Sequence, residues 1–347
     1  MGHANNNDWA NATDGEPRRS RRTFLLAGVL CAGLVLLLGI VFRDWIPGPW
    51  RSGDTRDNPF PTGALADYVP ADSEAVAAVQ VRSLLASPAG RRLAPSLRQL
   101  VRRGEQQFRW MDLLNIKPFD DLDSLQISFA PSSGGQPLWL ARGRLDRSRF
   151  QMGPDKLRAK KVDGFRVLEY TNRSSKRTTL LTPVGDALVV SDTPARVLAA
   201  LKQASDPRPI TVHDTTLREL LEKVDRRQSL WLAASFKHLA PIAEVESVWM
   251  KMILTPLLKH AESVHGSLTC ADDLRAELHF RTATEESAAK LEADLQSIHD
   301  LIPGAALLMG RQKELLPLLR LLGSGETSRD GKTVSLRCRL TADQLPE

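Results

Sequence analysis

The chain of 347 residues is long enough for two domains of ordinary size, and its 42% apolar content can supply a buried core. A 25% share of charged residues and only three cysteines exclude a wholly disordered chain and a disulfide framework. The net charge of +6 is small for this length, so we expect no nucleic-acid partner.

An uncharged segment of 20 residues, Thr23 to Phe42, predicts a transmembrane helix. At 1.5 Å per residue such a helix spans about 30 Å, which is the thickness of the hydrocarbon core of a bilayer. The segment is apolar on all sides, whereas a buried helix of a soluble protein is usually shorter and amphipathic. We therefore expect the lipid bilayer to be one partner of residues 23–42.

The orientation of this segment follows from four arginines directly before it: Arg18, Arg19, Arg21 and Arg22. Because such clusters stay on the cytoplasmic side, residues 1–22 are expected to form a cytoplasmic tail and the bulk of the chain to lie outside. Trp45 and Trp50 suit the far interface, where indole rings settle at headgroup level.

The segment favours an uncleaved signal-anchor over a cleaved leader, because it is longer than a secretory apolar region and lacks a small-residue cleavage site. Cys31 follows Leu30, where lipoprotein processing requires a small residue, so we interpret it as an apolar filler. Residues 20–25 resemble a twin-arginine signal, which leaves Sec and twin-arginine export both open. The expected location is the cell membrane of a bacterium, with a single pass and a periplasmic ectodomain.

Residues 43–63 contain four prolines and three glycines with little apolar content, a composition typical of an extended, semi-stiff stalk. Folded sequence is expected from residue 64, and the Pro-rich break at 205–209 divides it into a first module, 64–206, and a second, 207–347.

The first module begins with a strand and a long amphipathic helix, and then continues with strands and short helices. The predicted ranges, in chain order, are strand Glu74–Val81, helix Ser83–Phe108, strands Ser124–Phe129 and Pro137–Leu145, helical stretch Arg147–Lys160, strands Phe165–Tyr170, Thr178–Thr182 and Ala187–Ser191, and helix Ala195–Gln203.

The second module has a similar order of elements after a lead-in helix. The predicted ranges are helix Leu217–Val224, strand Ser229–Phe236, helix His238–His260, strands Ser263–Cys270 and Leu274–Thr282, helices Glu285–Leu301 and Lys313–Leu322, and strand Lys332–Leu340. Both modules reduce to strand–helix–strand–strand–helix–strand. This order predicts an α+β fold of two tandem ferredoxin-like (split βαβ) modules with antiparallel sheets.

Three stretches carry a resemblance: VPADSEAVAAVQVRSLLASP at 69–88, GFRVLEY at 164–170 with GDALVVSDTPARVLAAL at 185–201, and DGKTVSLRCRLTADQL at 330–345. In this succession the chain resembles a family of uncharacterised single-pass bacterial envelope proteins of unknown function. The resemblance implies an α+β ectodomain and carries over no binding or catalytic residues.

Two histidines form the only candidate metal ligands. If Cys270 and Leu274 close a hairpin, His265 lies directly opposite His279 on the polar face, close enough to share a metal ion. A zinc site needs one or two further ligands, so we interpret the pair as polar residues on a wet face and expect no metal or other cofactor. Cys270 and Cys338 fall on the apolar phase of their strands, which leaves open whether they form a disulfide or two separate buried thiols.

Other polar features have simpler interpretations. The first long helix is basic and could touch an anionic surface, although a solvated face is the usual explanation. Its arginines are Arg91, Arg92, Arg98, Arg102, Arg103 and Arg109. The segment 325–333 resembles a phosphate loop, but Glu326 stands where the first glycine belongs and the segment leads into a strand. The clustered acids at 120–123 and 272–273 are interpreted as turn and cap residues.

No motif of a known nucleophile, metalloprotease or dinucleotide site occurs in the sequence. The sequence therefore favours a non-catalytic binding or structural module of the envelope, with a protein partner or another copy of itself. The alternative is an envelope hydrolase whose carboxylate or histidine site is assembled only in the folded protein.

Overall fold

The structure is a computed structural model that describes residues 65, 68–103, 110–130, 137–150, 157–172, 177–206, 208, 211–237, 255, 257–308 and 316–345. The predicted tail, transmembrane segment and stalk lie outside these residues, together with the arginines at 18–22 and the tryptophans at 45 and 50. In the described part, no helix is both long and apolar enough to cross a bilayer.

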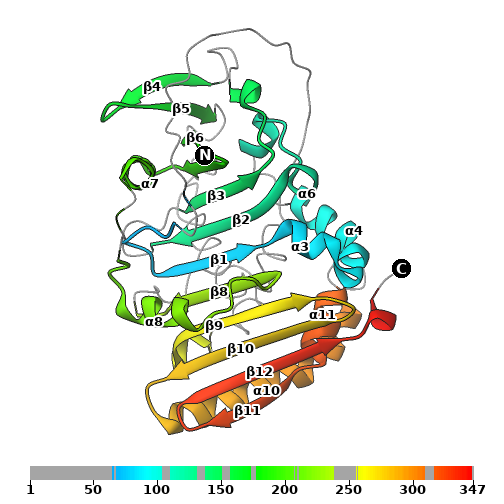
Figure 1. Ribbon diagram of the computed structural model, residues 1–347. Coiled ribbons are helices and arrows are strands. Elements are labelled where there is room, and N and C mark those ends of the chain that lie inside the picture. Colours follow the sequence, from blue (N-terminus) through cyan, green and yellow to red (C-terminus); the bar gives the residue numbers. More distant parts are fainter. Residues whose placement is uncertain are drawn as a thin grey trace, which may run out of the picture.

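One antiparallel sheet organises the described chain (Figure 1). Its twelve strands run in the order β11-β12-β10-β9-β8-β1-β2-β3-β7-β6-β5-β4. The strand bounds are β1 (Ala75–Val79), β2 (Leu122–Phe129), β3 (Leu138–Gly143), β4 (Arg158–Val162), β5 (Phe165–Asn172), β6 (Arg177–Val184), β7 (Ala187–Ser191), β8 (Leu230–Ser235), β9 (Ala261–Cys270), β10 (Leu274–Thr282), β11 (Glu326–Asp330) and β12 (Thr333–Leu340).

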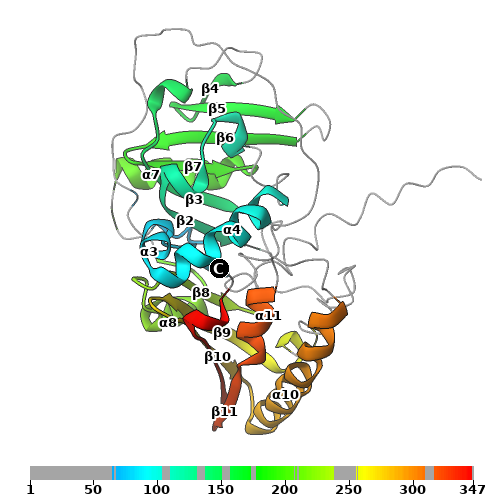
Figure 2. The same cartoon turned by 90° about the vertical axis from the view of Figure 1, so that its right-hand side faces the viewer.

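The helices cover the sheet from both sides, with α7 and α8 on one face and α10 and α11 on the other (Figures 1 and 2). Together with α4, the helices α10 and α11 bury the apolar side of β9, β10 and β12. The helix bounds are α3 (Val81–Ala86), α4 (Pro88–Arg103), α6 (Pro118–Asp121), α7 (Pro194–Ser205), α8 (Thr215–Lys223), α10 (Glu285–Leu308) and α11 (Leu316–Gly323).

The α+β class and the antiparallel pairing are confirmed, but the two expected sheets are joined into one. Strand β1 of the first half pairs with β8 of the second, with Ala77 opposite Leu232. Every residue of β8 is buried, and β1 is buried except at its last residue. Strands without a polar phase suit the middle of a sheet covered on both faces, which is where these two lie.

The strand order does not show the split βαβ plan, because β1 lies directly beside β2. In the split βαβ plan the helix carries the chain past the neighbouring strand position, so another strand lies between the two strands that the helix connects.

The predicted helix Ser83–Phe108 is broken in the structure. The Ser87 hydroxyl accepts a hydrogen bond from the Gly90 N–H at 3.0 Å, and Pro88 opens the next helix. Serine followed by proline is a typical helix start, so the sequence itself carries a local sign of this break.

Two further differences concern local elements, and one predicted helix is largely untested. The stretch Arg147–Lys160, predicted as helical, contains a short 3-10 helix at Arg147–Phe150, and strand β4 begins at Arg158. Strand β11 was not predicted; it forms a hairpin with β12 around Gly331. Most of the predicted helix His238–His260 lies outside the described residues.

Candidate functional site

The polar side of β9, β10 and β12, which we call the open face, is the most distinctive surface of the second half. No described helix covers it, and α8 borders it on the β8 side (Figures 1 and 2). Strand pairing places the following residues on this side: Ser263, His265, Ser267, Thr269, Arg275, Glu277, His279, Arg281, Ser335, Arg337 and Arg339. The reverse side is packed, so the sheet supplies a rigid support for these polar side chains.

The hairpin register predicted for β9 and β10 is confirmed, with Cys270 opposite Leu274 and His265 opposite His279. The two imidazole rings stack at 5.0 Å between centroids and 25° between planes. The pKa of His265 is lowered to about 4, mainly by burial and in addition by the charges of His279 and Lys223, while Glu277 acts in the opposite direction. His265 is therefore neutral at neutral pH.

His279 links a hydroxyl and a carboxylate across the open face. Its Nδ1 lies 2.9 Å from Ser335 Oγ, and its Nε2 lies 3.5 Å from Glu277 Oε1. These residue types are those of a serine hydrolase, but such enzymes also need free N–H groups to bind the oxyanion. Strand β12 is paired on both sides, so its backbone N–H groups near Ser335 are engaged in the sheet. Among the described residues, the arrangement is therefore a hydroxyl–imidazole–carboxylate chain whose neighbouring β12 N–H groups are not free to bind an oxyanion.

Within the described residues, the histidine pair has no further protein ligands of the kind that a closed metal site needs. In the ranges that the structure describes, no group of three or more His, Cys, Asp or Glu residues is placed to hold a metal ion. The two ring nitrogens of His279 lie next to Ser335 and Glu277. The histidine pair itself, His265 and His279, is brought together as predicted.

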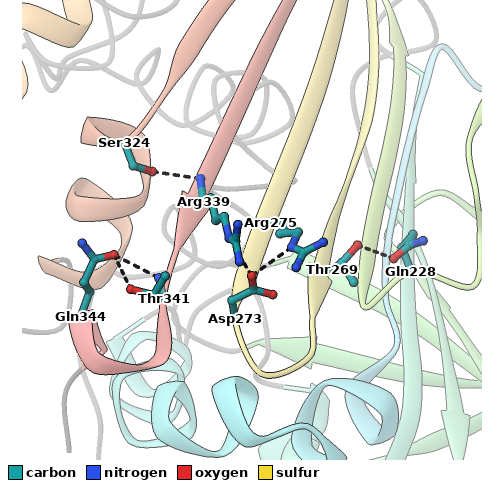
Figure 3. Close-up of polar contacts among 8 residues, drawn as sticks. All are labelled: Gln228, Thr269, Asp273, Arg275, Ser324, Arg339, Thr341 and Gln344. Atoms are coloured by element: carbon teal, nitrogen blue, oxygen red, sulfur yellow. Dashed lines mark hydrogen bonds and ion pairs between the residues drawn. The ribbon is translucent and has the colours of Figure 1, made fainter.

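A cluster of arginines lies at the hairpin end of the open face (Figure 3). The Nε atoms of Arg275 and Arg339 donate to the same oxygen of Asp273, at 3.0 and 2.8 Å. Burial raises the pKa of Asp273, but the hydrogen bonds and charges of the two arginines outweigh it and hold the pKa of this carboxyl below its ordinary value. Beside them, Arg337 donates through Nε to Glu277 Oε1 at 2.7 Å.

This arginine cluster was not predicted from the sequence, where Asp273 was expected only as a turn residue. The pairing of β10 with β12, which brings Arg275 opposite Arg339, joins residues far apart in the chain. The alternation of Arg337, Cys338 and Arg339 was the one local sign that two arginines share a face.

The two cysteines lie on the packed side as free thiols. Strand β10 separates their strands, since Cys338 pairs with Ala276 and Cys270 with Leu274. Burial raises the pKa of both thiols to about 12, with a hydrogen bond to Ser229 acting in the opposite direction on Cys270. Of the two alternatives left open by the sequence, the structure has the pair of separate buried thiols.

Three other features noted in the sequence have structural roles. On the basic helix α4, Arg92 donates to the carbonyl of Ala342, and the Arg98 guanidinium lies 5.6 Å from the centre of the Phe119 ring. The segment around Gly331 joins two strands, so it is not the strand-to-helix loop that binds phosphates. The Asp121 carboxylate accepts a hydrogen bond from the Lys117 N–H at the start of α6, as expected of a cap.

The chain matches no protein-family model, no curated protein and no solved structure.

Proposed function

We propose that the chain is a membrane-anchored, extracytoplasmic protein of the bacterial envelope that acts by binding and not by catalysis. Residues 1–22 form the cytoplasmic tail, residues 23–42 the anchor and residues 43–63 the stalk of the ectodomain. The partner is a protein or a second copy of the chain. The apolar length of the anchor and the arginines before it support this location.

The observation that carries the binding role is the open face. It is a polar surface on a rigid sheet, and its charged side chains extend well into solvent: Arg275 is 62% exposed and Arg337 63%. Interfaces outside the cores of obligate dimers are about as polar as other protein surfaces, so a face of this kind suits a reversible partner. We place the protein contact at the centre of the face, around Ser267 and Ser335.

The location is tested by adding protease to spheroplasts that express the full chain. We expect the ectodomain to be digested and a small fragment with the anchor to be protected. If the ectodomain resisted digestion until the membrane was lysed, the proposed orientation would be wrong.

The contact surface is tested with a photoreactive residue in place of Ser267, in cells that express the full chain. The matched control carries the same residue in place of Lys290, an exposed position on α10 on the opposite face. We expect a defined crosslinked protein from position 267 only. Equal crosslinking from both positions, or none from 267, would contradict the assignment of the open face.

A second candidate function, an envelope hydrolase, rests on the contact between Ser335 Oγ and His279 Nδ1 at 2.9 Å. A fluorophosphonate probe labels an activated serine. Labelling of the full chain that disappears in Ser335→Ala would favour the hydrolase. We expect no labelling, because the backbone N–H groups around Ser335 are engaged in the sheet.

A further inference from the structure

Two arginines of the open face stand directly opposite each other. Arg275 on β10 and Arg339 on β12 are register partners, which places their Cβ atoms roughly 5 Å apart. Like charges in this position destabilise a sheet, and the chain offsets the repulsion with a single carboxylate, that of Asp273.

The way in which Asp273 holds the two side chains leaves their outer nitrogens free. Each guanidinium donates through Nε to Asp273 Oδ2, and Figure 3 shows both groups pointing to this atom. In the part of the chain that the structure describes, no residue accepts a hydrogen bond from the Nη atoms of Arg275 or Arg339. The Asp273 side chain is 11% exposed, whereas the two arginine side chains are 62% and 63% exposed. A nearly buried carboxylate thus fixes two guanidinium groups whose remaining donors reach solvent.

A third arginine repeats the arrangement beside them. Arg337 lies two residues before Arg339 on the same side of β12, and its Nε donates to Glu277. Its Nη atoms also have no acceptor among the described residues, and its side chain is 63% exposed. Three guanidinium groups are therefore held by two carboxylates, and a third acid, Glu326 of β11, is the register partner of Arg337 on the same side of the sheet.

We infer that this cluster of Arg275, Arg337 and Arg339 is a binding site for an oxyanion ligand that carries at least two consecutive phosphate groups. This anion site is additional to the protein contact proposed above, and it lies only at the hairpin end of the open face.

Phosphate fits the cluster better than carboxylate. A phosphate group has at least three acceptor oxygens and a charge near −2, so it can bind the Nη pairs of two guanidinium groups at once, whereas a carboxylate balances only one. Adjacent strands are about 4.8 Å apart, and residues i and i+2 of one strand are about 6.7 Å apart, so two or three linked phosphates span all three arginines. Because Asp273 and Glu277 already fix the side chains, binding costs little conformational entropy.

The test uses the full-length chain in nanodiscs of neutral phosphatidylcholine, titrated with inorganic tripolyphosphate by calorimetry. We expect saturable binding with one site, and binding of citrate, a tricarboxylate, that is at least tenfold weaker. Arg275→Gln and Arg339→Gln should each weaken tripolyphosphate binding by about tenfold or more, since each removes a charge-assisted contact. Arg337→Gln should weaken it as well, and it leaves the Asp273 contacts intact if either of the other variants fails to fold.

The matched control is Arg281→Gln. Arg281 lies on β10, as Arg275 does, and on the same open face, but it is ion-paired with Glu219 of α8. We expect this variant to bind like the unmodified chain. If all four variants lost the same affinity for tripolyphosphate, the binding would be general electrostatic attraction. If citrate bound as tightly as tripolyphosphate, the site would have no preference for phosphate. Either result overturns the inference.

A separate arm uses vesicles that contain phosphatidylglycerol, mixed with the chain in neutral nanodiscs. Vesicle binding that persists in Arg275→Gln and Arg339→Gln, without tripolyphosphate binding, would assign the anionic contact to a membrane surface and overturn the inference. None of these measurements depends on where the chain is located in the cell, so they fail or succeed independently of the proposed orientation.

Discussion

Arg196 connects helix α7 to strand β2 and to the segment just before β1. Its side chain is 5% exposed, and its guanidinium donates to the carbonyl of Ser128 at 3.1 Å and to Ser73 Oγ at 3.3 Å. Asp72 lies 3.4 Å away and supplies the opposite charge. Burial lowers the pKa of Arg196, while Asp72 and Tyr68 oppose this effect. A buried arginine held in this way is costly to remove, because its partners keep their polar atoms in a site that water reaches poorly.

We expect Arg196→Ala to lower the free energy of unfolding by about 3 kcal/mol, measured by chemical denaturation. The matched control is Lys202→Ala on the same helix, since Lys202 makes an exposed ion pair with Asp163 at 3.0 Å. This control should change the free energy of unfolding by less than about 0.5 kcal/mol. Equal effects of the two substitutions would show that the buried contacts of Arg196 contribute no more than a surface pair.

His265 should make the stability of the fold depend on pH. Its pKa is about 4 in the folded protein, against an ordinary value of 6.5, and the groups that face it are His279, Lys223 and Glu277. Between these two pH values the unfolded chain binds more protons than the folded one, so stability is complete above pH 6.5 and falls as the pH drops towards 4.

We expect the free energy of unfolding to decrease by about 1–2 kcal/mol from this residue between pH 7 and pH 4.5, after allowance for solvent screening. The comparison is with His265→Asn at the same two pH values, because asparagine cannot titrate in this range. If both proteins lose the same free energy on acidification, the lowered pKa of His265 is not the cause.

At the scale of elements, local signals were sufficient for the β9–β10 hairpin and insufficient for most other pairings. The hairpin could be predicted because inward and outward residues alternate around a short turn, which fixes the register and places His265 opposite His279. The break in the first helix was also visible, as Ser87 followed by Pro88, but the helical periodicity on either side concealed it.

The pairing of β1 with β8 could not be predicted in this way. It joins residues about 150 positions apart, such as Ala77 and Leu232, and no local pattern specifies such a partner. The same limit applies to the arginine cluster, since Arg275 and Arg339 come together only through the pairing of β10 with β12. The sequence therefore predicts elements and a hairpin register, while the sheet order and most of the site follow from long-range packing.

Gly266 provides a test of the hairpin packing. A Cβ atom at this position would lie 2.2 Å from the carbonyl oxygen of Glu277 and 2.7 Å from Leu278 Cδ2. Because the first of these atoms belongs to the paired backbone, the strand itself would have to move. We expect Gly266→Ala to cost about 2–3 kcal/mol of unfolding free energy, whereas Ser267→Ala, on the open face next to it, should cost much less. A Gly266→Ala protein as stable as the parent would contradict the close approach of the two strands.

At the scale of the whole molecule, the joined sheet makes the two halves of the chain one packing unit. A single apolar cluster contains Ala77 and Phe129 from the first half and Leu232, Phe280 and Val334 from the second. Strand β1 pairs with β2 on one side and β8 on the other, so either half exposes a buried strand edge if the other unfolds. Such an edge leaves backbone groups and apolar side chains unpaired at once, which favours unfolding of both halves together.

We therefore expect amides of β2 and β10 to lose hydrogen-exchange protection at the same denaturant concentration in the full-length chain, with opening free energies that agree within about 1 kcal/mol. Leu232→Ala makes the test sharper, because it removes a buried side chain of β8 and should cost about 2–5 kcal/mol. In a joined unit this substitution lowers the protection of β2 as much as that of β10, although β2 belongs to the other half. If only β10 and its neighbours lost protection, the chain would fold as two units divided near residue 206, and the pairing of β1 with β8 would add little to the stability of either.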